Sequence, residues 1–184
     1  MKKSSINFFL VLLIFLVTSN GFAQKLITKT GNLKFQASMP SFEEVAAENK
    51  SVSAVLEQST GDFAALVLIK GFRFKVALME EHFNENYMES EKFSKATFKG
   101  KIEDFDVSKI TNTTKNFTLK GDLTIHGKTK TVSAIIKISN VPNGVYATGS
   151  FDVKPNDFDI DIPSIVSKKI ADKVKIVYNF TLIK

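Results

Sequence analysis

Two histidines are the side chains of this chain with the clearest capacity for acid–base or metal chemistry. His82 follows two glutamates, and His126 precedes a glycine. A helical metal site usually carries two histidines one turn apart, as in H-E-x-x-H, and this spacing is absent around His82. We therefore predict structural roles for both residues. For His82, a backbone hydrogen bond and a contact with the polar end group of a ligand both stay open.

Three aspartates near the carboxyl end could suggest calcium. Asp157, Asp159 and Asp161 alternate with Phe158 and Ile160. Calcium loops of the helix–loop–helix type also need a central glycine and a distal glutamate, and neither follows here. We interpret the aspartates as the outward face of a strand, and we predict no metal site and no cofactor.

Sequence motifs for covalent catalysis are missing, although serine is plentiful. The chain holds no cysteine, no Gly-x-Ser-x-Gly and no glycine-rich phosphate loop. Without cysteine, thiolate nucleophiles, thiolate metal sites, disulfides and lipid-modified cysteine anchors are all excluded. We predict that the protein is not an enzyme, and catalysis ranks last among three alternatives.

The first residues have the layout of a secretory signal peptide. Lys2 and Lys3 precede an almost unbroken apolar run, residues 6–17, and small residues follow up to Ala23. A membrane anchor is the alternative, but the run is shorter than the roughly 20 residues that span a bilayer. We predict cleavage after Ala23, a domain over residues 24–184, and a periplasmic or secreted location.

Charge argues against a nucleic-acid partner. The net charge is +6, but Arg73 is the only arginine and the lysines are scattered among apolar residues. Nucleic-acid sites need clustered positive charge. A lysine-rich solvated face is the simpler interpretation, and transient contact with an anionic membrane surface stays open.

Alternation of apolar and polar residues dominates the rest of the chain, which is typical of strands with one buried face. The predicted strand segments are 25–30, 32–39, 50–58, 63–74, 95–107, 115–126, 129–140, 144–154 and 173–183, and it stays open whether two of them form one strand with a bend. Short helical pieces are expected within 40–46, 76–87 and 163–170. The pattern predicts an all-β protein of about eight strands, closed as a barrel or stacked as a sandwich.

The interior rows mix large residues with alanine and glycine, which leaves two interpretations. In a barrel of about eight strands, small residues can leave a tunnel for one ligand. Alternatively, they fit against some of the 17 phenylalanine rings in a close-packed core. Residues 63–69 are apolar on both faces, so we expect this strand to be covered on both sides.

Several segments resemble one family. They are LMEEHFNENYMES at 78–90, KATFKG at 95–100, GDLTIHGKTK at 121–130, GSF at 149–151 and DFDI at 157–160. Together they resemble the YceI-like family of lipid- or polyisoprenoid-binding proteins, over nearly the whole chain after residue 23. The resemblance implies an extended antiparallel lipocalin-like β-barrel with one or two short helices and an apolar interior.

The function that this resemblance implies is sequestering or carrying an apolar lipid, such as a polyprenyl compound or an isoprenoid quinone. A ligand-free structural or interaction barrel of the cell envelope is the alternative, and a homodimer stays open. The predicted wall residues are Phe35, Leu66, Leu68, Phe98, Phe117, Leu119, Leu123, Ile136, Phe151, Ile176 and Tyr178.

Overall fold

A computed structural model describes residues 24–38, 44–164 and 170–184 of the chain. Its strands are β1 (Lys25–Ser38), β2 (Ala46–Glu57), β3 (Asp62–Leu68), β4 (Arg73–Phe74), β5 (Lys95–Ile102), β6 (Lys115–Ile125), β7 (Lys128–Val141), β8 (Gly144–Val153) and β9 (Ile170–Ile183). Its helices are α2 (Ala77–His82), the π-helical turn η2 (Phe83–Tyr87) and the 3₁₀ turns η1 (Ile69–Gly71), η3 (Val107–Lys109) and η4 (Pro155–Phe158).

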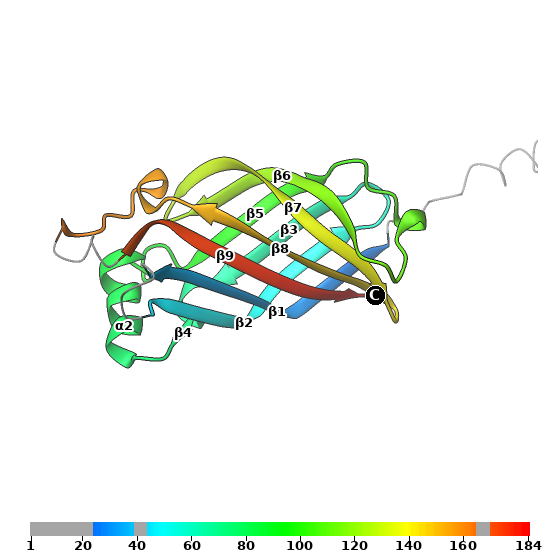
Figure 1. The fold of residues 1–184 in the computed structure, drawn as a ribbon. Coiled ribbons are helices and arrows are strands. Elements are labelled where there is room, and N and C mark those ends of the chain that lie inside the picture. The colour runs from blue at the N-terminus through cyan, green and yellow to red at the C-terminus, as the bar shows by residue number, and fades with distance from the viewer. Residues whose placement is uncertain (1–23, 39–43, 165–169) are drawn as a thin grey trace, which may run out of the picture.

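The eight long strands form a closed antiparallel barrel (Figure 1). Neighbours follow the order β1-β9-β8-β7-β6-β5-β3-β2, and β2 pairs with β1 to complete the ring. The two-residue strand β4 pairs only with the start of β2. The predicted all-β, lipocalin-like barrel is therefore confirmed, and α2 lies at the end of the barrel opposite the carboxyl terminus (Figure 1).

Period-two alternation decides which side chains face inward. In β7, Ile136 and Ile138 are fully buried. Ile135 lies on the outward face of the strand with Ser133 and Lys137, and it is 51% exposed. The same parity holds in β9, where Tyr178, Phe180 and Leu182 are buried. Each strand thus contributes one apolar row to a shared core, as its sequence pattern requires.

Glycines in the barrel wall make room for aromatic rings. Gly100 and Gly121 are direct cross-strand partners, and the ring of Phe98 lies over both, because a Cβ on either would approach that ring within 3 Å. Gly31 faces Phe180 in the same way. The close-packed interpretation therefore holds for these glycines.

Some predicted boundaries were wrong for identifiable reasons. The expected strand 63–74 ends at Leu68, where the buried side chain of Asn49 donates a hydrogen bond to the Leu68 carbonyl at 2.9 Å. The predicted strands 25–30 and 32–39 form one strand with an irregular register after Thr28. The strand expected over 95–107 stops at Ile102.

The helical expectations had mixed outcomes. The helix predicted over 76–87 appears as α2 and η2. The piece expected over 40–46 is absent from residues 44–46, since Ala46 already begins β2, and its remaining residues lie outside the described part of the chain. The piece expected over 163–170 lies mostly outside the described residues, and Ile170 begins β9.

Candidate ligand cavity

A cavity of about 460 Å³ lies inside the half of the barrel next to α2. This volume is within the range of pockets that hold small organic ligands. All eight long strands contribute to its wall. Among the described lining residues there is no Asp, Glu, Lys or Arg, and side-chain nitrogen or oxygen atoms come only from His82, Tyr87, Thr97 and Tyr178. The cavity therefore offers apolar contact over nearly its whole surface.

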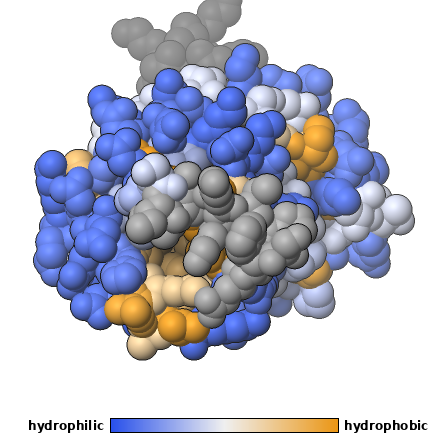
Figure 2. Space-filling view, turned by 60° about the vertical axis from the view of Figure 1, so that its left-hand side comes forward, coloured by the Kyte–Doolittle hydropathy of each residue, from blue (hydrophilic) through white to orange (hydrophobic). Residues whose placement is uncertain are grey.

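The other half of the barrel is solidly packed. The side chains that fill it have no measurable exposure and do not line the cavity; they are Leu26, Leu56, Ile102, Ile136, Ile138 and Leu182. We call this set the sealed end. Its residues belong to the strand halves farther from α2. Figure 2 turns the α2 end toward the viewer and shows hydrophobic side chains there among hydrophilic ones. The described residues thus leave the α2 end as the route into the cavity.

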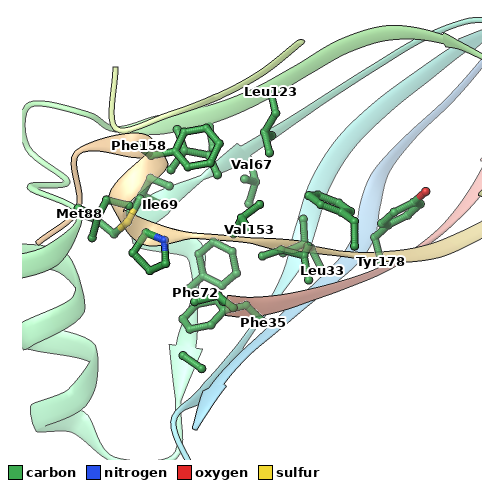
Figure 3. A pocket seen from close by; sticks show the side chains of 18 of the residues that line it. Leu33, Phe35, Val67, Ile69, Phe72, Met88, Leu123, Val153, Phe158 and Tyr178 are labelled. Carbon is green, nitrogen blue, oxygen red and sulfur yellow. The ribbon is translucent and has the colours of Figure 1, made fainter. Parts of the chain in front are cut away.

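Four phenylalanines form one wall at the α2 end. Phe35 of β1 packs against Phe72 and Phe83 with ring centroids 5.3 Å apart in both pairs. Phe74 lies 5.1 Å from Phe83. Such edge-on and stacked contacts add to the free energy gained from burial alone. The cluster fixes η2 against the barrel wall, and Figure 3 shows Phe35 and Phe72 side by side in the cavity.

The opposite side of the mouth is formed by η4. Phe158 is 2% exposed and Ile160 is 9% exposed, and both line the cavity. The backbone of Asp159 between them is left-handed, with φ of 53°, and its carboxylate pairs with Lys128 at 2.8 Å. The interpretation of these aspartates as the outward face of a strand was therefore wrong, because β8 ends at Val153 and η4 follows. The three carboxylates are exposed on a turn and the segment after it, whereas Phe158 and Ile160 point into the core.

His126 connects three segments of this rim. Its Nε2 lies 2.8 Å from a carboxylate oxygen of Glu89, and its Nδ1 lies 3.2 Å from the carbonyl oxygen of Phe158. The ring of Phe93 packs on the imidazole at 4.3 Å. The geometry gives His126 a structural role, as the sequence predicted.

Most predicted wall residues border the cavity, but their contact with a ligand stays a prediction. Those at the cavity are Phe35, Leu66, Phe98, Leu119, Leu123, Phe151, Ile176 and Tyr178. His82 is exposed and lines the mouth, and its side chain makes no hydrogen bond to any other described residue. Its contact with a polar end group also stays a prediction.

Three predicted wall residues lie elsewhere. Leu68 is 54% exposed, because the inward row of β3 runs through Phe63, Ala65 and Val67. The expectation that this strand is covered on both faces was therefore wrong at Leu68. Phe117 and Ile136 face inward but lie toward the sealed end, where Phe117 packs against Phe105 at 6.0 Å.

Sequence reasoning missed the residues supplied by irregular segments. Figure 3 shows Ile69, Met88 and Phe158 around the same space, although they come from η1, the segment after η2, and η4. None of them belongs to an alternating row. The family resemblance around 78–90 and 157–160 was the only signal in the sequence that could have drawn attention to Met88 and Phe158.

Among the described residues of the cavity wall, Tyr178 carries a buried hydroxyl that has no hydrogen-bond partner. The residue is 5% exposed, and its hydroxyl oxygen makes no hydrogen bond with the described residues. Burial raises the pKa of the Tyr178 phenol far above its usual value, because a phenolate would lack solvation there. The group is therefore a neutral hydroxyl over the physiological pH range.

The part of the chain that the structure describes shows neither a metal cluster nor a membrane-spanning helix. No group of three or more His, Asp or Glu side chains within 24–38, 44–164 and 170–184 is arranged to hold a metal ion. No helix in that same part of the chain is long and apolar enough to span a bilayer.

Comparison with known proteins agrees with this architecture. The YceI-like domain model matches residues 17–182, and the chain belongs to the YceI-like family. No curated protein sequence gives a significant match.

Solved structures share the fold at low sequence identity. A polyisoprenoid-binding domain from Saccharophagus degradans, described as implicated in plant cell wall breakdown, has a TM-score of 0.73 at 11% identity, covering 84% of this chain and 95% of that one. BcnA from Burkholderia cenocepacia has a TM-score of 0.66 at 16% identity, covering 81% and 94%. The Campylobacter jejuni YCEI protein has a TM-score of 0.62 at 18% identity, covering 78% and 87%.

Proposed function

We propose that this protein is an exported binding protein that holds one apolar lipid chain, of the isoprenoid kind, in its barrel. The observation that carries the proposal is the cavity of about 460 Å³, whose described lining residues include no Asp, Glu, Lys or Arg. The printed description of the Saccharophagus degradans domain as polyisoprenoid-binding supports this ligand class.

The physical basis of binding is removal of hydrocarbon from water. A prenyl chain has no hydrogen-bonding groups, so the wall needs no matched polar set. Each square ångström of apolar surface buried contributes about 25 cal/mol. Phenylalanine and aliphatic side chains, such as Phe98, Leu123 and Phe151, supply that contact. We infer binding and transport as the activity, and we propose no catalytic role.

Native mass spectrometry of the exported protein tests the proposal. Protein purified after export from a bacterial host should carry an added mass of a few hundred daltons that organic extraction removes. Extracted protein should then bind an isoprenoid quinone or a polyprenol at one-to-one stoichiometry. A protein that stays free of ligand after incubation with both lipids would favour the structural or interaction barrel.

A further inference from the structure

The segment that begins with η4 covers one side of the cavity mouth with two apolar side chains. Phe158 and Ile160 are buried, and both line the cavity. Figure 3 shows Phe158 and Met88 toward the α2 end of the cavity, and Tyr178 farther from it. A lipid that leaves through the mouth has to pass these side chains, so the position of η4 controls how wide the exit is.

Two side chains of the β6–β7 hairpin tie η4 to the rest of the rim. Lys128 pairs with Asp159 at 2.8 Å, but both side chains are more than half exposed, and exposed pairs contribute little. The side chain of His126 is only 9% exposed, and its Nδ1 lies 3.2 Å from the carbonyl oxygen of Phe158. The buried tie therefore runs through the imidazole.

The imidazole keeps both of its hydrogen bonds only as an imidazolium. Its Nε2 lies 2.8 Å from a carboxylate oxygen of Glu89, and its Nδ1 faces a carbonyl oxygen, so both partners are acceptors. A neutral imidazole has one N–H donor and one lone pair. The carboxylate is charged and closer, so it retains the single N–H. The lone pair of Nδ1 then faces the carbonyl oxygen of Phe158, and the tie to η4 is lost.

Charged groups from each neighbouring segment surround this rim. The segment after η2 contributes Glu89 and Lys92, whose charged groups lie 3.9 Å apart. The hairpin contributes Lys128, and η4 and the residue after it contribute Asp157, which is exposed, and Asp159. Carboxylates and ammonium groups as classes keep their charges between about pH 5.5 and pH 8, whereas histidine changes its charge in this range.

We propose that η4 is a lid over the cavity, which the imidazolium form of His126 holds closed. When pH rises and Nδ1 loses its proton, the tie to Phe158 is lost and the lid loosens. The lipid is then retained in mildly acidic surroundings and released faster in mildly alkaline ones. This inference rests on the proposed function for its cargo, but the lid itself can be measured in ligand-free protein.

Release of an isoprenoid probe tests the lid on exported protein after lipid extraction. The probe is all-trans-retinol, which is fluorescent and uncharged, and an excess of phosphatidylcholine vesicles accepts it. Release should be about tenfold faster at about pH 8 than at about pH 5.5, the worth of one hydrogen bond. His126→Asn should release retinol fast at both pH values, and asparagine tolerates the left-handed backbone of this position. His82→Asn replaces the other histidine of the chain and should keep the tenfold ratio.

Hydrogen exchange in ligand-free protein gives a readout that does not depend on lipid. The amide of Ile160 donates a hydrogen bond to the carbonyl oxygen of Pro155 within the lid. After correction for the intrinsic effect of pH, protection of the amides of residues 155–160 should fall as pH rises in wild-type protein and in His82→Asn. It should stay constant in His126→Asn, and amides of the sealed end, such as that of Ile138, should not respond in any of the three proteins.

The outcomes distinguish the lid from the proposed function. Release or lid exchange that does not vary with pH in wild-type protein would overturn the lid, as would a pH dependence that His82→Asn removes and His126→Asn keeps. If lid exchange behaves as expected but retinol does not bind, the proposed function fails and the lid stands. If His126→Asn does not fold, wild-type protein and His82→Asn decide, because a pH dependence that survives in His82→Asn leaves His126 as its source.

Discussion

His126 and Glu89 are 37 residues apart in the chain, yet the Nε2 atom of the histidine lies 2.8 Å from a carboxylate oxygen of the glutamate. Both have left-handed backbones, with φ of 50° and 42°. The other imidazole nitrogen faces the carbonyl oxygen of Phe158. Both partners are acceptors, so both nitrogens donate when the two bonds exist together. One side chain thereby holds the β6–β7 turn, the end of the helical segment and η4 in register around the mouth.

Removing this imidazole should loosen the rim. We expect His126→Ala to lower the free energy of unfolding by roughly 1–3 kcal/mol, because the Phe158 carbonyl and Glu89 lose their partner. Urea denaturation measures the change. His82→Ala is the matched control, since the His82 side chain is exposed and makes no hydrogen bond with the described residues. Its effect should stay within about 0.5 kcal/mol. Equal effects of the two substitutions would contradict the role given to His126.

Filling the cavity should abolish lipid uptake without unfolding the barrel. Leu119 is buried in the cavity wall, so the larger indole of Leu119→Trp occupies space that the lipid needs. Leu68→Trp makes the same change on the outer surface and should bind normally. Native mass spectrometry measures uptake, and circular dichroism checks folding.

If Leu119→Trp fails to fold, Ala134→Phe provides a second obstruction from the neighbouring strand β7, where Ala134 is the cross-strand partner of Leu119. Normal lipid binding by a folded variant of either kind would argue against the cavity as the binding site.

Alkaline solution should lower the free energy of unfolding because the phenol of Tyr178 is buried. Its pKa is raised in the folded protein, so between about pH 10 and that higher value the unfolded chain has lost a proton that the native state retains. The contribution of this phenol to the free energy of unfolding is fully present below the pKa that it has in the unfolded chain. It decreases as pH rises above that pKa, by up to about 1.4 kcal/mol per pH unit. Urea denaturation at pH 9 and pH 11 should show a smaller decrease for Tyr178→Phe. Identical decreases in both proteins would be incompatible with a deeply buried phenol.

A side chain at position 121 should destabilise the fold, because the backbones of two strands are in close contact at Gly121. A Cβ there would lie 2.4 Å from the Cα of Gly100 and from the carbonyl oxygen of Lys99, and neither backbone atom can move freely. We expect Gly121→Ala to cost about 1–3 kcal/mol of stability. Lys120→Ala, on the exposed face of the same strand, should be nearly neutral in thermal denaturation.

Processing at the amino terminus is open to direct measurement. Exported protein should begin at Gln24, which intact-mass analysis of the purified material reports. A mass that includes residues 1–23 would favour the membrane-anchor alternative. This test is independent of ligand binding.

The strand rows could be predicted because each has one buried and one solvated face. Leu119 and Leu123 were placed on the correct face by alternation alone. Where alternation vanishes, the prediction had no basis for choosing a face, and the choice of Leu68 over Val67 was wrong. Alternation also assigns a face but no depth along the barrel, which is why Ile136 was expected in the cavity and lies in the sealed end.

The remaining lining residues come from segments whose geometry depends on distant partners. Phe158 points inward because η4 is held by contacts to His126 and Lys128, more than 25 residues earlier in the chain. No local pattern encodes such contacts. The sequence shows the charged residues and histidines of the rim, but which of them pair with each other could be determined only from the folded barrel.

The sealed end has a kinetic consequence for any occupant. A tube with two openings allows an incoming molecule to push the resident one out at the far side. Here the described residues give the cavity one entrance, with Leu26, Leu56 and Ile102 blocking the opposite direction. Exchange is then dissociative, so the resident departs before its replacement enters. Its residence time is set by the mouth alone and does not shorten as competing lipid accumulates.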